Sequence, residues 1–406
     1  MIQNKIILDA TMQIVEMLLE TDKFEDALNN GLELIVKGLK CEEGVMWISD
    51  EKTGRLYPLI CIGPADISNI SIENNSGITG HVVTTGESVV IPDVSADPRY
   101  DGSVFDDYGL AVRSMICVPL KTTRQVMGCI QIINSSDSSV FSEESLMLCQ
   151  RMASLSAMVL EEKDFHIDTG PEKEVIIKLR NIIKEFPSGD GVLRVLKGIN
   201  LDIYKGEFLV ILGESGCGKS TLVNIIGGMD SLTDGELYVN GKDFSHPSDD
   251  ELTQFRREYM GFVFQQYNLM PNLTALENIR FIAEIAKDPM SSKDALEMVG
   301  LSDRAGNYPS ALSGGQQQRI SIARAIVKNP QIIFADEPTA ALDYSTSIEV
   351  LHIFEEIVKQ KGSTVVMITH NPEIAKMADR VIKLRYGLVF SIRRNLTPAK
   401  AEELVW

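Results

Sequence analysis

The side chains best suited to chemistry begin with a glycine-rich loop in the second half of the chain. Gly213-Glu-Ser-Gly-Cys-Gly-Lys-Ser220 matches the pattern G-x-x-x-x-G-K-[ST], with an apolar strand-like run before it and a helix-like run after it. Glycines let such a loop curl so that successive N–H groups point at phosphate oxygens. Lys219 can reach the β- and γ-phosphates, and Ser220 can hold Mg²⁺. The predicted phosphate-binding residues are Gly213, Glu214, Ser215, Gly216, Cys217, Gly218, Lys219, Ser220 and Thr221.

Two carboxylates close an apolar run further along the chain. Gln331-Ile-Ile-Phe-Ala-Asp-Glu-Pro338 places Asp336 and Glu337 where a buried parallel strand should end. Open α/β sheets bind ligands at the carboxyl ends of their strands, so these side chains should lie near the glycine-rich loop. We expect Asp336 to hold Mg²⁺ through water and Glu337 to polarise an attacking water as a general base.

A third motif, Leu312-Ser-Gly-Gly-Gln-Gln-Gln-Arg319, precedes a predicted helix. Its Ser313 hydroxyl and the backbone of Gly314 and Gly315 form a second helix start that can bind an anion. This motif is the signature sequence of ABC-type ATPases, and the chain from 173 to 406 resembles that family, with the other family motifs in the expected order.

The resemblance implies the cofactors ATP and Mg²⁺ and assigns further site residues. Gln265 matches the Q-loop glutamine, a catalytic and metal-contacting residue, and His370 matches the switch histidine, which is catalytic. Phe186 matches an aromatic residue that stacks on adenine, although it could also be a core residue. In this family two copies sandwich two ATP molecules, so the nucleotide would also contact a second copy. The residues concerned are Ser313, Gly314, Gly315, Gln316 and Asp343.

Motifs around the catalytic ones resemble the lipoprotein-release, macrolide-export and antimicrobial-peptide-resistance subgroup. They include Val195-Leu-Lys-Gly-Ile-Asn-Leu201, Gly261-Phe-Val-Phe-Gln-Gln-Tyr-Asn-Leu-Met-Pro271 and Leu273-Thr-Ala-Leu-Glu-Asn278. Members of this subgroup pair with a separate permease of the mechanotransmission type. The resemblance therefore implies docking on such a permease through the segment after Gln265, whose apolar tips could instead belong to the subdomain core.

The first half of the chain has a different pattern of elements. Helical periodicity at residues 6–18 and again at 146–160 brackets five short strand-like runs, which indicates an α+β module. Residues 77–93, 97–100, 113–120 and 128–134 resemble a GAF domain. The expected architecture is an α+β GAF domain over 1–163, a linker over 164–172 and an α/β P-loop NTPase domain of ABC type, with a helical subdomain, over 173–406.

The GAF resemblance implies regulation or dimerisation and leaves the ligand open. Asn134 and Phe141 fit the pattern of cyclic-nucleotide GAF domains, but Ser135 replaces its lysine. His81 could ligate a metal and is more simply a hydrogen-bonded structural residue. Cys117 and Cys129 could form a redox pair, but the favoured interpretation is that they are small core residues.

Charge and hydropathy bound the remaining possibilities. The net charge is −18, and residues 1–170 carry 12 basic and 26 acidic side chains, so nucleic acid is disfavoured as a partner. Neither a membrane-spanning run nor a signal peptide is evident, and no C-x-x-C pair suggests zinc or redox exchange. We expect a cytoplasmic ATPase that is peripheral on the inner face of the cell membrane through its permease. The alternative is a soluble ABC-type regulatory or mechanochemical ATPase that the GAF domain controls.

Overall fold

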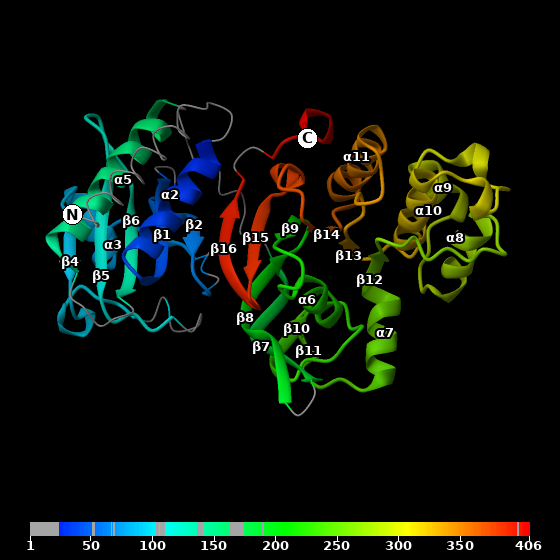
Figure 1. The fold of residues 1–406 in the computed structure, drawn as a ribbon, viewed down its shortest axis with the longest axis horizontal. Coiled ribbons are helices and arrows are strands. Elements are labelled where there is room, and N and C mark those ends of the chain that lie inside the picture. Colours follow the sequence, from blue (N-terminus) through cyan, green and yellow to red (C-terminus); the bar gives the residue numbers. More distant parts are fainter. Residues whose placement is uncertain are drawn as a thin grey trace. The chain divides into compact units, whose positions relative to one another are not determined.

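The computed structural model describes most of the chain, and its internal contacts divide it into two units (Figure 1). Unit 1 comprises Met1–Glu172 and Val389–Leu396, and unit 2 comprises Lys173–Leu388 and Thr397–Trp406. The domain boundaries that the sequence predicts, at 163 and 173, stay a prediction. The described residues are 24–50, 53–65, 67, 70–102, 105, 110–135, 141–162, 174–188, 191–395 and 398–406.

Unit 1 is built on one antiparallel sheet in the order β16-β2-β1-β6-β5-β4, with the short β3 also paired to β2. Its strands are β1 (Cys41–Asp50), β2 (Arg55–Ile62), β3 (Ile72–Glu73), β4 (Val89–Ile91), β5 (Met115–Lys121), β6 (Val126–Ser135) and β16 (Leu388–Arg394). Its helices are α2 (Phe24–Gly38), α3 (Gly77–Thr85) and α5 (Glu143–Glu162), with a 3₁₀ turn at Val94–Ala96.

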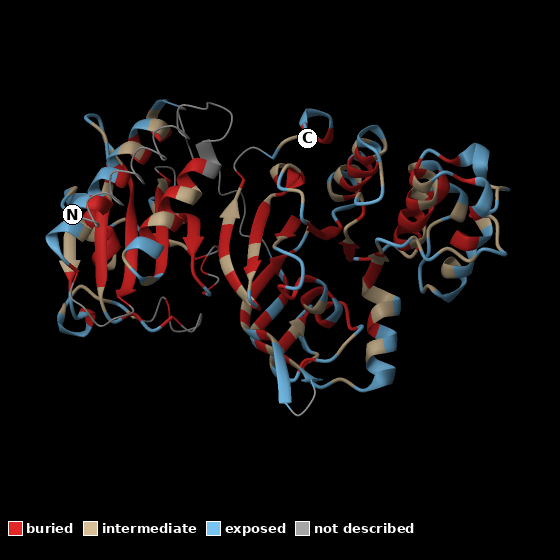
Figure 2. Ribbon diagram, in the orientation of Figure 1, coloured by how far each residue is buried: buried red, intermediate tan, exposed pale blue. Residues whose placement is uncertain are grey.

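Both faces of this sheet are covered, so its strands are buried on two sides (Figure 2). Successive residues of a strand point to opposite faces, and β1 shows the result. Met46 packs with α2 and α5 residues such as Leu32 and Met152, whereas Trp47 packs with α3 residues such as Val82. Two apolar layers therefore hold one sheet, as the α+β pattern predicted.

Unit 2 contains a parallel sheet in the order β12-β13-β14-β9-β15 and a separate antiparallel sheet in the order β11-β10-β7-β8. The parallel strands are β9 (Phe208–Leu212), β12 (Met260–Val263), β13 (Ile332–Asp336), β14 (Thr364–Thr369) and β15 (Arg380–Arg385). The antiparallel strands are β7 (Val175–Ser188), β8 (Gly191–Tyr204), β10 (Asp234–Val239) and β11 (Lys242–Asp243). The register pairs Asp336 with Ile368 and Thr369 with Leu212, so the carboxyl ends of β13, β14 and β9 lie level.

Six helices complete the described part of unit 2, and α8, α9 and α10 pack on one another as a helical group. The six are α6 (Lys219–Ile226), α7 (Asp249–Tyr259), α8 (Ala275–Ile285), α9 (Ser292–Met298), α10 (Gly314–Ile326) and α11 (Tyr344–Lys361). Short 3₁₀ turns lie at Ser302–Arg304, Pro309–Ala311, Ile374–Met377 and Ala401–Glu403. Capping boxes begin α7, α8 and α10, because a Ser or Thr and a Glu or Gln three residues later exchange hydrogen bonds with backbone N–H groups.

The fold class predicted from the sequence is confirmed, and each of the five predicted strands of the first half is present. The predicted helix at residues 6–18 and the linker at 164–172 lie outside the described residues. Helix α2 was not predicted. Within the described part of the chain, no helix is both long and apolar enough to cross a bilayer.

Candidate functional site

The glycine-rich loop joins β9 to α6 and encloses its own lysine. Gly216 and Gly218 have φ angles of 78° and 106°, which side chains larger than glycine rarely adopt. The ammonium of Lys219 is buried and donates to the carbonyl oxygens of Gly213, at 2.7 Å, and Glu214, at 2.9 Å. The loop therefore holds a positive charge at its centre, beside the N-terminus of α6, which is the arrangement that a phosphate group requires.

The carboxylate of Asp336 lies next to this loop, at the end of β13. Burial raises the pKa of Asp336, and a hydrogen bond from the side chain of Ser220 opposes that rise. A hydroxyl and a carboxylate are hard oxygen donors of the kind that Mg²⁺ prefers. Among the described residues no group of three or more His, Cys, Asp and Glu side chains could hold a metal.

Glu337 and His370 meet at the ends of two neighbouring strands. A Glu337 carboxylate oxygen lies 2.8 Å from Nδ1 of His370, and the Glu337 N–H donates to the carbonyl oxygen of Ile368 at 3.0 Å. The Glu337 backbone is left-handed, with a φ of 49°, a conformation that a non-glycine residue seldom adopts. Only 16% of the Glu337 side chain is exposed, against 69% for His370. A partly buried carboxylate held by an imidazole can accept a proton from water.

The other predicted residues Gln265, Phe186 and Cys217 differ in their exposure. Gln265 is exposed and follows β12 by two residues, so it also lies at the carboxyl end of the sheet. Phe186, on β7, is 36% exposed, and the Lys184 ammonium lies 4.9 Å from the centre of its ring. Cys217 is buried in the glycine-rich loop, where its carbonyl oxygen accepts the Gly387 N–H at 3.1 Å.

The signature residues lie elsewhere in unit 2. Ser313 caps α10 and exchanges hydrogen bonds with Gln316, with its hydroxyl accepting the Gln316 N–H at 3.3 Å. Gly314 and Gly315 form the first turn, and a Cβ atom at Gly315 would lie 2.0 Å from Cγ2 of Thr346. Figure 1 shows α10 within the helical group and apart from α6. The structure thus brings Lys219, Ser220, Asp336, Glu337 and His370 to one sheet edge but leaves the signature turn outside that cluster.

Asp343 caps α11 and is held ionised by local hydrogen bonds. Its carboxylate accepts the Thr346 N–H at 3.0 Å, the Thr346 hydroxyl at 2.9 Å and the Ser345 hydroxyl at 2.7 Å. These bonds lower the pKa of Asp343 to about 2. The side chain is therefore a fixed negative charge at the start of the helix, where it interacts favourably with the positive end of the helix dipole.

Sequence reasoning missed a buried amide that shapes the loop after Gln265. Asn278, on α8, is fully buried, and its Oδ1 accepts the Met270 N–H at 2.8 Å. Its Nδ2 lies 3.1 Å from the carbonyl oxygen of Met270 and 3.0 Å from that of Leu273. From the other side, Arg324 of α10 donates to the Asn268 carbonyl oxygen at 2.6 Å. In the sequence, the motif 273–278 that contains Asn278 indicates only the subgroup resemblance.

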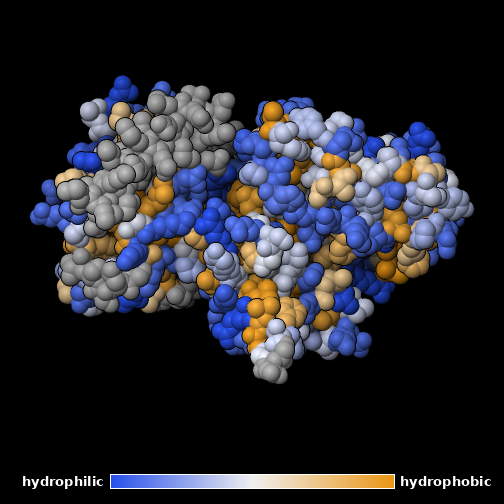
Figure 3. All heavy atoms as spheres, in the orientation of Figure 1, coloured by the Kyte–Doolittle hydropathy of each residue, from blue (hydrophilic) through white to orange (hydrophobic). Residues whose placement is uncertain are grey.

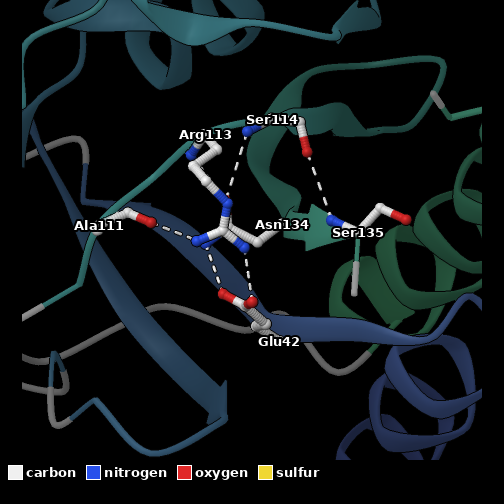
Figure 4. Close-up of polar contacts among 6 residues, drawn as sticks. All are labelled: Glu42, Ala111, Arg113, Ser114, Asn134 and Ser135. Carbon is white, nitrogen blue, oxygen red and sulfur yellow. Dashed lines mark hydrogen bonds and ion pairs between the residues drawn. The ribbon is translucent and has the colours of Figure 1, made fainter. Parts of the chain in front are cut away.

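In unit 1, Asn134 holds a loop to the end of β6 (Figure 4). Its Oδ1 accepts the Arg113 N–H at 2.7 Å, while its Nδ2 donates to Glu42 at 2.7 Å and to the Ala111 carbonyl oxygen at 2.8 Å. Arg113 completes the network by an ion pair with Glu42 at 2.6 Å. The amide is thus engaged on both sides by protein groups, which gives Asn134 a structural role here.

The other unit 1 candidates also have structural surroundings. Phe141, Cys117 and Cys129 are buried, and burial raises the pKa of the Cys129 thiol well above its usual value. His81, on α3, belongs to no metal-binding group among the described residues. A small, partly open pocket is lined by Ile72, Ser76, Gly77, Ile78, Thr79, Tyr100, Asp101, Phe105, Met115 and Gln131.

Comparison with known proteins gives a match to each half. The family model described as ABC transporter matches residues 196–340, and the GAF domain model matches residues 23–160. An uncharacterized ABC transporter ATP-binding protein of Methanocaldococcus jannaschii, MJ1508, is 46% identical over 222 residues, 53% of this chain and 99% of that protein. The macrolide export ATP-binding/permease protein MacB of Escherichia coli K12 is 45% identical over 217 residues, 52% of this chain and 33% of that protein.

A putative ABC transporter ATP-binding protein of Mycoplasma genitalium, MG065, is 48% identical over 234 residues, 57% of this chain and 50% of its own length. The chain therefore spans half or less of several relatives that it matches. Among solved structures, a dimeric post-hydrolysis state of the ATP-binding cassette MJ0796 bound to ADP and Pi is 42% identical, with a TM-score of 0.51. That match covers 54% of this chain and 98% of the cassette.

Proposed function

The chain belongs to the family of ABC transporter ATP-binding proteins, and from that premise we propose that it is an ATP-hydrolysing subunit that acts in pairs on a separate membrane permease. The observation that carries this proposal is the meeting of three motifs at one sheet edge. Three separate stretches of chain supply these groups, namely Lys219 with Ser220, Asp336 with Glu337, and His370. They converge at the ends of three adjacent strands.

Each group in that cluster has a task in ATP hydrolysis. Lys219 and the loop N–H groups bind the phosphates, so the ammonium exchanges its bonds to loop carbonyls for bonds to phosphate oxygens. Ser220, Asp336 and Gln265 would hold Mg²⁺, which neutralises phosphate charge when it is bound. Glu337 accepts a proton from the attacking water, and His370 keeps that carboxylate in place and reaches toward the γ-phosphate.

A second copy of the chain would complete the site. The signature turn begins α10, which Figure 1 shows apart from α6, and the Asp343 carboxylate bonds only to its own helix turn in the contacts described above; a related cassette forms dimers. We infer that these groups contact nucleotide bound to the partner copy. ATP binding would then close the pair and hydrolysis would open it, a two-state change that a ligand controls.

The helical group of α8, α9 and α10 is the surface proposed to dock on a permease. Figure 3 shows hydrophobic atoms on the visible face of this group, and α8 exposes 46% of Phe281 and 48% of Ile285. The loop after Gln265, which Asn278 holds, lies beside α8. A permease of the mechanotransmission type would place the chain at the inner face of the cell membrane. Unit 1 would regulate the ATPase, with the pocket on α3 available to a small ligand.

Glu337→Gln tests the catalytic assignment. Loss of the general base should lower the ATP turnover by about 10²- to 10⁴-fold while nucleotide binding is retained. Glu356→Gln, which changes a half-buried carboxylate of α11, is the matched control and should hydrolyse ATP like the wild type. Normal turnover in Glu337→Gln would refute the assignment.

The same variant also tests the partner. Glu337→Gln should trap the closed pair with ATP and Mg²⁺ in solubilised membranes of its host, and a multi-spanning permease should co-purify with it. Recovery of soluble proteins alone would instead favour a soluble ATPase that unit 1 controls.

A further inference from the structure

The first residue after Asp343 is anchored by a distant part of the chain. Tyr344 begins α11, and its hydroxyl donates to the Leu404 carbonyl oxygen at 2.7 Å. Its ring meets the ring of Trp406 edge to face, with the ring centres 5.2 Å apart. Tyr344 is nevertheless 46% exposed, so burial in the core does not hold it in place. Residues 404 and 406 are therefore its principal anchors.

Those anchors are themselves fixed to unit 2. Ala401 and Leu404 are each 1% exposed and belong to the main apolar core of that unit. The Ala401 N–H donates to the Glu355 carboxylate of α11 at 3.4 Å, and the Ala399 N–H donates to the Lys376 carbonyl oxygen at 2.9 Å. The tail thus packs along α11 and reaches back to the first turn of that helix.

The first turn of α11 is also the element that sets Asp343. All three bonds to the Asp343 carboxylate come from Ser345 and Thr346 of that turn. Thr346 packs against Gly315 of the signature turn. A shift of Tyr344 would therefore move Asp343 and the contact with the signature turn together.

We propose that Tyr344 is a positioning residue for Asp343, with Leu404 and Trp406 as its anchors. The inference rests on the proposed function, because it assigns Asp343 to the ATP site of a paired copy. Asp343 then meets the nucleotide of the partner copy correctly only while Tyr344 holds the first turn of α11 in place.

The test separates positioning from stability in the full-length chain. Tyr344→Phe removes the bond to Leu404, and Trp406→Ala removes the ring contact. Each should lower kcat by about two- to tenfold, the range that one lost hydrogen bond or ring contact allows. The affinity of the unpaired chain for ATP should be unchanged, because Asp343 contacts only the nucleotide of the partner copy. Trp406→Phe, which keeps a ring, should restore kcat. Tyr238→Phe is the matched control, since it removes a tyrosine bond to Glu236 on another sheet.

The outcomes also distinguish the two proposals. If Glu337→Gln is inactive while Tyr344→Phe and Trp406→Ala turn over like the wild type, the positioning role is wrong and the ATPase assignment stands. If Glu337→Gln turns over normally, the proposed function itself fails.

Discussion

Replacing Asn278 with alanine should release the loop after Gln265 while leaving the helical group folded. The side chain is fully buried and serves residues 270–274 of that loop from its position on α8. Removing it leaves the Met270 N–H without its acceptor and two carbonyl oxygens without a donor. The surrounding loop residues are half-buried or exposed, so water can replace part of what is lost.

The size of the effect follows from counting these bonds. The amide can donate two hydrogens and accept one N–H, so three bonds are lost at about 1 kcal/mol each. Opening of the loop should therefore become easier by about 3 kcal/mol, which corresponds to a roughly hundredfold rise in the exchange rate of the Met270 amide hydrogen.

Hydrogen exchange followed by mass spectrometry of peptides from 266–274 measures this rise directly. Peptides from α10 should exchange as in the wild type, because their helix bonds do not involve Asn278. Gln254→Ala, which removes one exposed side-chain amide bond to Glu258 at 3.3 Å, is the matched control. Unchanged exchange at Met270 in Asn278→Ala would show that other contacts hold the loop and that the bond count is misleading.

Three further variants test other features. Glu43→Gln should stabilise unit 1 toward urea at about pH 8 and have little effect near pH 4. Burial raises the pKa of Glu43, so the folded state favours the protonated carboxyl group. The wild-type unit 1 therefore loses stability as the pH rises above the pKa that Glu43 has in the unfolded chain. Arg380→Met should lower the free energy of unfolding of unit 2 by about 3–5 kcal/mol, measured by thermal unfolding, because Glu207 stays buried after the Arg380 cation is removed. A loss as small as that from breaking an exposed ion pair would contradict this. Lys219→Ala should weaken ATP binding by at least about tenfold, so that ATP no longer raises the melting temperature.

The parts of the site that the sequence predicts are those in which chemistry and position come from one short stretch. A glycine-rich loop between an apolar strand and a helix needs no distant partner to be identified, and Asp336 is placed by the apolar run before it. Parallel strands then bring such ends together, since their carboxyl ends share one edge of the sheet. For this reason the convergence of Lys219 and Asp336 followed from local patterns.

Other features depend on contacts that no local pattern records. Asn278 is one polar residue in an amphipathic helix, and only the path of the preceding loop reveals its role. Asn134 fits a ligand-binding pattern, yet its amide binds residues 111–113 and Glu42. Helix α2 is a different case. Leu28, Leu32 and Ile35 recur at helical spacing, so the sequence does contain a pattern that predicts this helix.

The position of β16 in the sequence has a consequence for how the chain is synthesised. More than three hundred residues separate β2 from β16, so the ribosome makes every other described strand of unit 1 well before β16. At the usual rate of translation, the outer edge of β2 beside Ile60–Ile62 waits roughly 15–65 s for its partner. Unpaired strand edges are sites of aggregation, so the nascent chain needs either a temporary cover for this edge or a chaperone until synthesis is nearly finished. A fragment that ends at residue 163 would keep that edge permanently, and we expect it to be less soluble than one to which residues 388–395 are supplied as a peptide.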